Sequence, residues 1–71
     1  MNSREALIAL KNGRSIQASF AKNSSMFYKI FYGDIIILME QVTSCASEEI
    51  ERLSDENFLT RGDVSEFVIY D

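Results

Sequence analysis

Two apolar runs joined by a glycine turn constrain the fold of this 71-residue chain more than any other feature. Residues 26–32 and 35–42 are rich in aromatic, β-branched and other apolar side chains, as expected of two neighbouring strands. Gly33-Asp34 between them is typical of a two-residue hairpin loop, and glycine at its first position suits a type II′ turn. The sequence therefore predicts a central antiparallel hairpin in which the two residues flanking this loop lie opposite each other.

This register gives the hairpin two apolar faces. One face, with Phe27, Phe31 and Leu38, is expected to form the main core under a helix. The opposite face is a candidate partner or oligomer surface, because tyrosine and methionine suit adaptable interfaces; its members are Tyr28, Ile30, Tyr32, Ile37 and Met39. Two alternatives stay open, since the sheet either curls into a small barrel or has its second face covered by residues 47–59 of a monomer. A bulge near Met26 exchanges the two faces.

The segment before the hairpin predicts a helix and one more strand. Asn2 and Glu5 form the capping-box pattern that starts a helix over residues 3–11, and Gly13 is a natural stop after it. Residues 15–21 then alternate between apolar and polar side chains, as in a strand with one buried face.

The segment after the hairpin predicts a second helix. Ser44 or Ser47 is expected to cap a helix that runs to about Leu53, and residues 67–70 predict a last short strand. Together these elements predict one α+β domain over residues 1–71. Its short N-terminal helix packs on a three- to four-stranded antiparallel sheet, and a second short helix follows the third strand.

Composition limits the chemistry available to the chain. Cys45 is the only cysteine and there is no histidine, which removes an intramolecular disulfide, a Cys/His zinc site and the usual general base of nucleophilic catalysis. No cofactor motif or calcium-loop spacing is present either. We therefore expect a protein that is not an enzyme and holds no metal or cofactor. A free thiol, no export signal and no apolar run of membrane length predict a cytoplasmic location.

The length of the chain favours association. A domain this small buries only about 60% of the surface that its unfolded chain exposes, so small folds usually need a staple or a partner subunit. Because no disulfide or zinc staple is available here, self-association or a binding partner is the expected source of further burial. We therefore expect a homo-oligomer.

Charge is segregated along the chain. Residues 1–29 hold five basic residues and one acid, a net charge of +4, whereas residues 30–71 hold ten acids and two basic residues, a net charge of −8. The densest acids form a candidate acidic face, which is either an ordinary solvated helix face or an imitation of a phosphate backbone; they are Glu48, Glu49, Glu51, Asp55 and Glu56. An isoelectric point near 4.6 argues against direct nucleic-acid binding.

Both ends of the chain resemble a known family. They are similar to small phage and prophage proteins in two stretches, namely Glu5-Ala6-Leu7 with Leu10-Lys11-Asn12-Gly13-Arg14 and Ile16, and the closing Glu66-Phe67-Val68-Ile69-Tyr70. Characterised members of that family are anti-defence proteins that counter the Thoeris system by sequestering a cyclic-nucleotide-like signal. The early tryptophan and the terminal Asp-Asp-Trp of the family are absent here, so no ligand residue is carried over. A helix followed by a strongly bent sheet is also similar to Sm-like barrels.

The residues and the resemblance together predict binding rather than catalysis. The first expectation is a small phage or prophage accessory protein that inhibits a host-defence or other host factor, or sequesters a small nucleotide-like molecule. The alternative is an acidic nucleic-acid mimic that inhibits a DNA-acting host enzyme. Salt separates the two, because a mimic loses its partner steeply as ionic strength rises, whereas an apolar interface does not.

Overall fold

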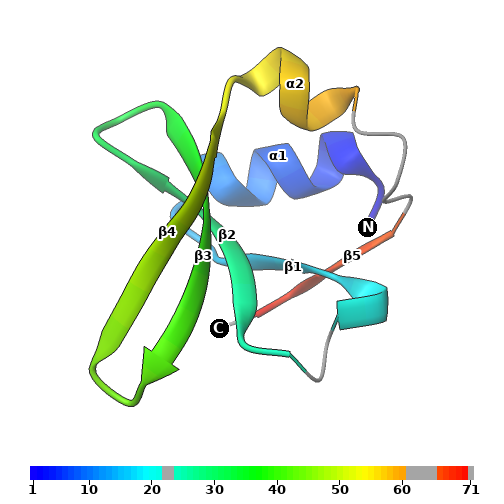
Figure 1. Cartoon of the computed structure of the whole chain (residues 1–71). Coiled ribbons are helices and arrows are strands. Elements are labelled where there is room, and N and C mark those ends of the chain that lie inside the picture. The colour runs from blue at the N-terminus through cyan, green and yellow to red at the C-terminus, as the bar shows by residue number, and fades with distance from the viewer. Residues whose placement is uncertain (22–23, 61–65, 71) are drawn as a thin grey trace.

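A computed structural model of the chain describes residues 1–21, 24–60 and 66–70. These residues form helices and strands (Figure 1). Their order is α1 (Ser3–Lys11), β1 (Ile16–Ala18), the 3-10 helix η1 (Ser19–Ala21), β2 (Met26–Phe31), β3 (Ile35–Thr43), β4 (Ala46–Leu53), α2 (Asp55–Leu59) and β5 (Phe67–Ile69).

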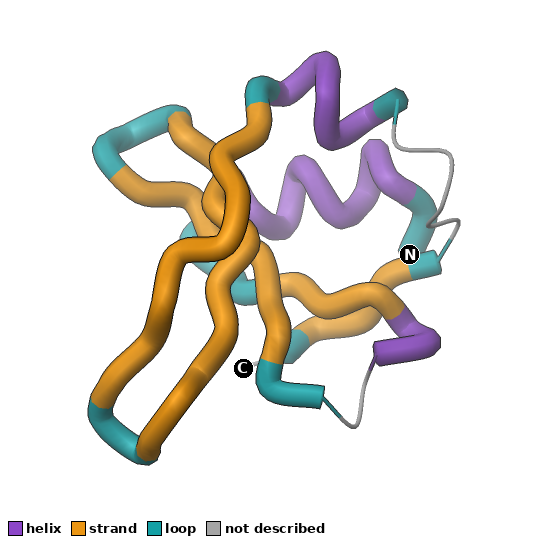
Figure 2. The backbone as a smooth tube through the Cα atoms, in the orientation of Figure 1, coloured by secondary structure: helices purple, strands orange, loops and turns teal. Residues whose placement is uncertain are grey.

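The five strands form one antiparallel sheet in the order β4-β3-β2-β1-β5. Strands β2, β3 and β4 follow one another as a meander, and β5 returns to pair with β1. The sheet twists strongly, so that β1 and β5 run across the direction of β3 and β4 (Figure 1). Helices α1 and α2 lie toward one end of the molecule and the β3–β4 turn lies at the other (Figure 2). The predicted α+β class, with an N-terminal helix on an antiparallel sheet, is confirmed.

The main core lies between the two helices and one face of the sheet. Helix α1 contributes Ala6 and Leu10 from its buried side, and the short α2 contributes the fully buried Phe58. The Phe58 ring stands edge-on to Tyr28 with the ring centroids 5.4 Å apart, and its centroid lies 5.2 Å from that of Phe67. The other buried members come from the strands and are Ile16, Ala18, Ile36, Leu38 and Leu53.

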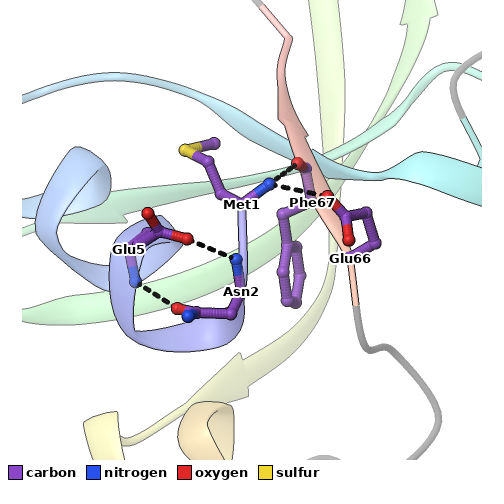
Figure 3. Close-up of polar contacts among 5 residues, drawn as sticks. All are labelled: Met1, Asn2, Glu5, Glu66 and Phe67. Atoms are coloured by element: carbon purple, nitrogen blue, oxygen red, sulfur yellow. Dashed lines mark hydrogen bonds and ion pairs between the residues drawn. The ribbon is translucent and has the colours of Figure 1, made fainter.

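Polar contacts fasten the start of α1 as the sequence predicts. The Asn2 side chain accepts a hydrogen bond from the Glu5 N–H, and the Glu5 carboxylate accepts one from the Asn2 N–H, both at 2.9 Å (Figure 3). The Met1 ammonium donates to the Phe67 carbonyl at 2.8 Å and to Glu66 Oε1 at 3.0 Å. The Phe67 N–H donates in return to the Met1 carbonyl at 2.7 Å. These contacts join the start of α1 to β5.

The predicted helix capped by Ser44 or Ser47 is wrong, because Ala46–Leu53 form strand β4. Serine caps and glutamates favour a helix locally, but this segment pairs with β3 along its length. Tertiary pairing overrides local propensity here. The second helix follows this fourth strand and begins after Ser54, whose side chain accepts a hydrogen bond from the Asn57 N–H at 3.1 Å.

The predicted register of the central hairpin is wrong by one residue. Phe31 rather than Tyr32 lies opposite Ile35, so three residues form the loop. Tyr32 and Gly33 both have positive φ, of 56° and 91°, whereas a type II′ turn has positive φ only at its first central position. Gly33 therefore has the left-handed backbone expected of it. The shift of one residue nevertheless changes which side chains of β2 and β3 share a face.

Candidate interaction surface

The β3–β4 hairpin extends away from the helices (Figure 1 and Figure 2). Within β4 only Leu53 is buried, and the seven residues before it are exposed. Among the described strands β4 ends the sheet, with β3 as its one neighbour. One side of the β4 backbone therefore has no strand partner in the described part of the chain.

Two bulges shape this hairpin. The pairing of the two strands skips Ile50 of β4 and, nearer the turn, Val42 of β3. These two residues are among the exposed large apolar side chains, with 48% of Ile50 and 55% of Val42 accessible. Because a bulge bends its strand and re-aims side chains, the extra residues present apolar groups to solvent.

The bulge at Ile50 also creates an ion pair along β4. In a regular strand residues three apart point to opposite faces, but the extra residue puts Glu49 and Arg52 on the same face. Arg52 Nε donates to Glu49 Oε2 at 2.7 Å, and Arg52 Nη2 donates to Glu49 Oε1 at 3.2 Å. The hydrogen bond from Arg52 lowers the pKa of the Glu49 carboxyl below its usual value. The one basic residue of β4 is therefore already matched by an acid.

The other face of the β3–β4 hairpin carries three acids. Glu40 of β3 lies directly opposite Glu48 of β4, and Glu51 lies on the same face, opposite Leu38. Like charges opposite each other on neighbouring strands are destabilising. Among the described residues neither Glu40 nor Glu48 has an ion pair or a side-chain hydrogen bond. We call Glu40, Glu48 and Glu51 the acidic hairpin face.

The structure divides the candidate acidic face that the sequence predicts. Three of its five members lie on β4, whereas Asp55 and Glu56 lie in the first turn of α2. Asp55 Oδ2 lies 2.7 Å from Lys11 Nζ, which ties α2 to α1. Asp55 and Glu49 of this predicted face therefore each have a cation beside them.

The candidate apolar face is also divided, because it depends on the predicted register. Tyr28 and Ile30 point toward the main core, and Tyr32 is 79% exposed in the turn. Ile37 and Met39 lie on the opposite face of the sheet. Since Ile37 is only 3% exposed, most of the burial that the prediction assigned to a second chain is reached within one chain.

A small second cluster covers this opposite face. The Tyr70 ring stacks on Phe27 with the ring centroids 4.6 Å apart, and the Tyr70 hydroxyl donates to Gln41 Oε1 at 3.4 Å. The buried Gln17 side chain donates to two backbone carbonyls between β1 and β2. Tyr70 follows β5 yet reaches side chains of β2 and β3, so the sheet curls here. The segment 47–59, which the sequence offered as a cover for this face, instead forms most of β4, which extends the sheet, and α2, which packs Phe58 into the main core.

Three surface residues were missed by sequence reasoning, namely Glu40, Val42 and Ile50. Their positions depend on the β3–β4 pairing and its bulges.

Cys45 is exposed in the turn of the hairpin, where its N–H donates to Thr43 Oγ1 at 3.4 Å. Within the described ranges no group of His, Cys, Asp and Glu residues is placed to hold a metal ion. No helix in these ranges is long and apolar enough to span a membrane.

Comparisons with protein-family models, curated proteins and solved structures found no match for this chain.

Proposed function

We propose that the protein is a small phage or prophage accessory protein that acts by binding, without catalysis, in the cytoplasm of a bacterial host. Its target is a host-defence or other host factor that it inhibits, or a nucleotide-like small molecule that it sequesters. The phage setting draws on the resemblance of residues 5–16 and 66–70 to the Thoeris anti-defence family. The proposal requires no cofactor or metal.

The exposed strand β4 carries the binding proposal. A 71-residue chain has little apolar surface with which to build a core, yet β4 buries only Leu53. Residues 46–52 add nothing to the main core, and Val42 and Ile50 expose apolar side chains on the same hairpin. Because the core does not require residues 46–52, the presence of this exposed strand supports a role in recognition.

Self-association remains part of the proposal, but fewer residues are available to form its interface. Of the apolar face that the sequence offered to a second copy, Tyr28 and Ile30 pack in the main core and Ile37 is 3% exposed, so these residues require no partner for burial. A homo-oligomer would have to use exposed residues instead, such as Val42 and Ile50 of the hairpin.

A nucleic-acid mimic is the second candidate, and the acidic hairpin face favours it. Glu40 and Glu48 present carboxylates from two neighbouring strands, and neither has an ion pair among the described residues. The cations beside Glu49 and Asp55 weaken this candidate, because they reduce the negative charge of the wider surface. A mimic should release its partner steeply between about 50 mM and about 500 mM salt, over which the Debye length falls severalfold.

An infection assay tests the proposal. Bacteria that carry a Thoeris system are challenged with phage while they express the protein, a hairpin variant with Val42→Ser and Ile50→Ser, or a control variant with Ile8→Ser on the exposed side of α1. We expect the protein and the control variant to restore plaques and the hairpin variant to restore far fewer. Circular dichroism establishes that all three fold.

The contradicting result combines two observations. The first is that the unaltered protein restores no plaques. The second is that heat denaturation of protein purified from infected cells releases no small molecule detectable by mass spectrometry.

A further inference from the structure

We propose that the open edge of β4 binds an extended peptide segment rich in lysine or arginine, which joins the sheet as a further strand. This inference rests on the proposed binding function and names the chemistry of the partner. Its basis is the free hydrogen-bonding edge of β4 together with the charge beside that edge.

The open edge is the first part of the argument. An edge strand presents N–H and C=O groups to which an incoming strand can pair. Strand β4 has eight residues, and its outer side faces no described strand. The other edge strand, β5, has three residues, and Met1 already exchanges backbone hydrogen bonds with Phe67 there. Of the two edges in the described sheet, β4 is therefore the one available for pairing.

The charge beside this edge selects the partner. A strand placed next to β4 sets some of its side chains beside Glu48, on the face that Glu48 shares with Glu40. Basic side chains at these positions would offset the repulsion between Glu40 and Glu48, which no described cation relieves. Arg52 is unavailable for that role, because it lies on the other face and is bound to Glu49.

A second copy of this chain fits the same edge poorly. Two β4 strands side by side bring three glutamates of each copy together, and each Arg52 is already bound to its own Glu49. Charged side chains are also one of the devices by which proteins prevent edge strands from pairing with strands of like charge. The negative charge that discourages a second copy of β4 from pairing here therefore favours a strand with basic side chains.

Synthetic eight-residue peptides test the proposal. The probe is acetyl-(Lys-Thr)4-amide, whose alternation places all lysines on one face of a strand. Acetyl-(Glu-Thr)4-amide reverses the charge. Acetyl-(Lys-Pro)4-amide keeps the charge of the probe but pairs poorly as a strand, because proline lacks the N–H. Binding is followed by fluorescence anisotropy of labelled peptide at low salt and by amide hydrogen exchange of the protein.

We expect the Lys-Thr peptide to bind and the other two peptides not to bind. Bound peptide should slow amide exchange in residues 46–52. Glu48→Gln should weaken binding about two- to fivefold, the range that one exposed charge pair supplies. Glu56→Gln removes an equally exposed acid from α2 and should leave binding unchanged.

Each of the other outcomes overturns the proposal. Equal binding of the Lys-Pro peptide would mean charge attraction without strand addition, and equal effects of the two variants would remove the role of Glu48. No binding, protection outside β4, or a dimer whose β4 amides are protected without peptide would each show that the edge is not the site. The infection assay is independent of these peptides, so the peptide proposal and the proposed function can fail separately.

Discussion

Replacing Tyr32 with asparagine is expected to stabilise the protein. Tyr32 has a φ of 56° and is followed by Gly33 with a φ of 91°. Left-handed backbone costs an ordinary L-residue about 1–2 kcal/mol. Asparagine tolerates this conformation better, and Asn-Gly is the preferred pair where two successive turn residues have positive φ. Tyr32→Asn therefore removes most of the free-energy cost of the left-handed backbone at this position.

Little stabilising contact is lost in this exchange. The Tyr32 side chain is 79% exposed, and its ring makes a tilted contact with Phe31 at a centroid distance of 6.4 Å. An exposed ring contact of this kind contributes about 0.5 kcal/mol. The net gain in unfolding free energy is then about 0.5–1 kcal/mol, which raises the melting temperature of a domain this size by about 2–8 °C.

Thermal melts followed by circular dichroism measure the effect against two controls. Tyr32→Phe keeps the left-handed cost and should melt with the unaltered protein. Gly33→Val should lose about 1–3 kcal/mol through backbone strain alone, since the space around Gly33 is open. The type II′ turn predicted from sequence puts Tyr32 in a strand, where asparagine is disfavoured, so it predicts the opposite sign. A lower melting temperature for Tyr32→Asn, with Tyr32→Phe unchanged, refutes the three-residue loop.

Three further outcomes are expected. Phe58→Ala should lower the unfolding free energy, measured in urea, by about 3–5 kcal/mol because it empties a fully buried site. Phe20→Ala, at a 75% exposed position, should change it by less than about 0.5 kcal/mol. Similar losses in the two variants would contradict the packing of α2 on the core. In a carboxyl NMR titration the Glu49 pKa should lie below 4.5, so that the stability from its pair with Arg52 is complete above pH 4.5 and is lost as the pH falls through the lowered pKa. Arg52→Gln should return that pKa to its usual value, and no return would assign the shift to another group. Acetylation of the Met1 amine should lower the unfolding free energy by about 1 kcal/mol, because it turns the charged donor to the Phe67 carbonyl into a neutral amide N–H. An unchanged urea midpoint would show that the positive charge contributes nothing to this contact.

Elements set by local contacts were predicted well from the sequence. The capping box of Asn2 and Glu5 and the left-handed Gly13 located α1 at its observed bounds. The two apolar runs located β2 and β3 to within one residue at their ends. In these segments short-range hydrogen bonds and side-chain periodicity agree with the tertiary fold.

Strand β4 could not be predicted because its side chains carry no strand signal. Residues 46–52 are exposed on both faces, so they show no apolar alternation, and their glutamates are common in helices. Pairing with β3 makes the segment a strand, and that contact is tertiary.

The face of each hairpin side chain was missed for a different reason. The register depends on Tyr32 adopting a left-handed backbone, which tyrosine rarely does. Because the predicted apolar face depended on that register, Tyr28 and Ile30 were assigned away from the core to which they belong.

Amide hydrogen exchange of the free protein tests most directly whether β4 is a strand with one open edge. In an antiparallel edge strand, alternate N–H groups bond to the neighbouring strand while the others face solvent. We expect slow and fast exchange to alternate along residues 46–49 and the alternation to be interrupted at the bulge of Ile50. Uniformly slow exchange would show that the edge is already paired, and uniformly fast exchange would show that the strand does not form; either result contradicts the account.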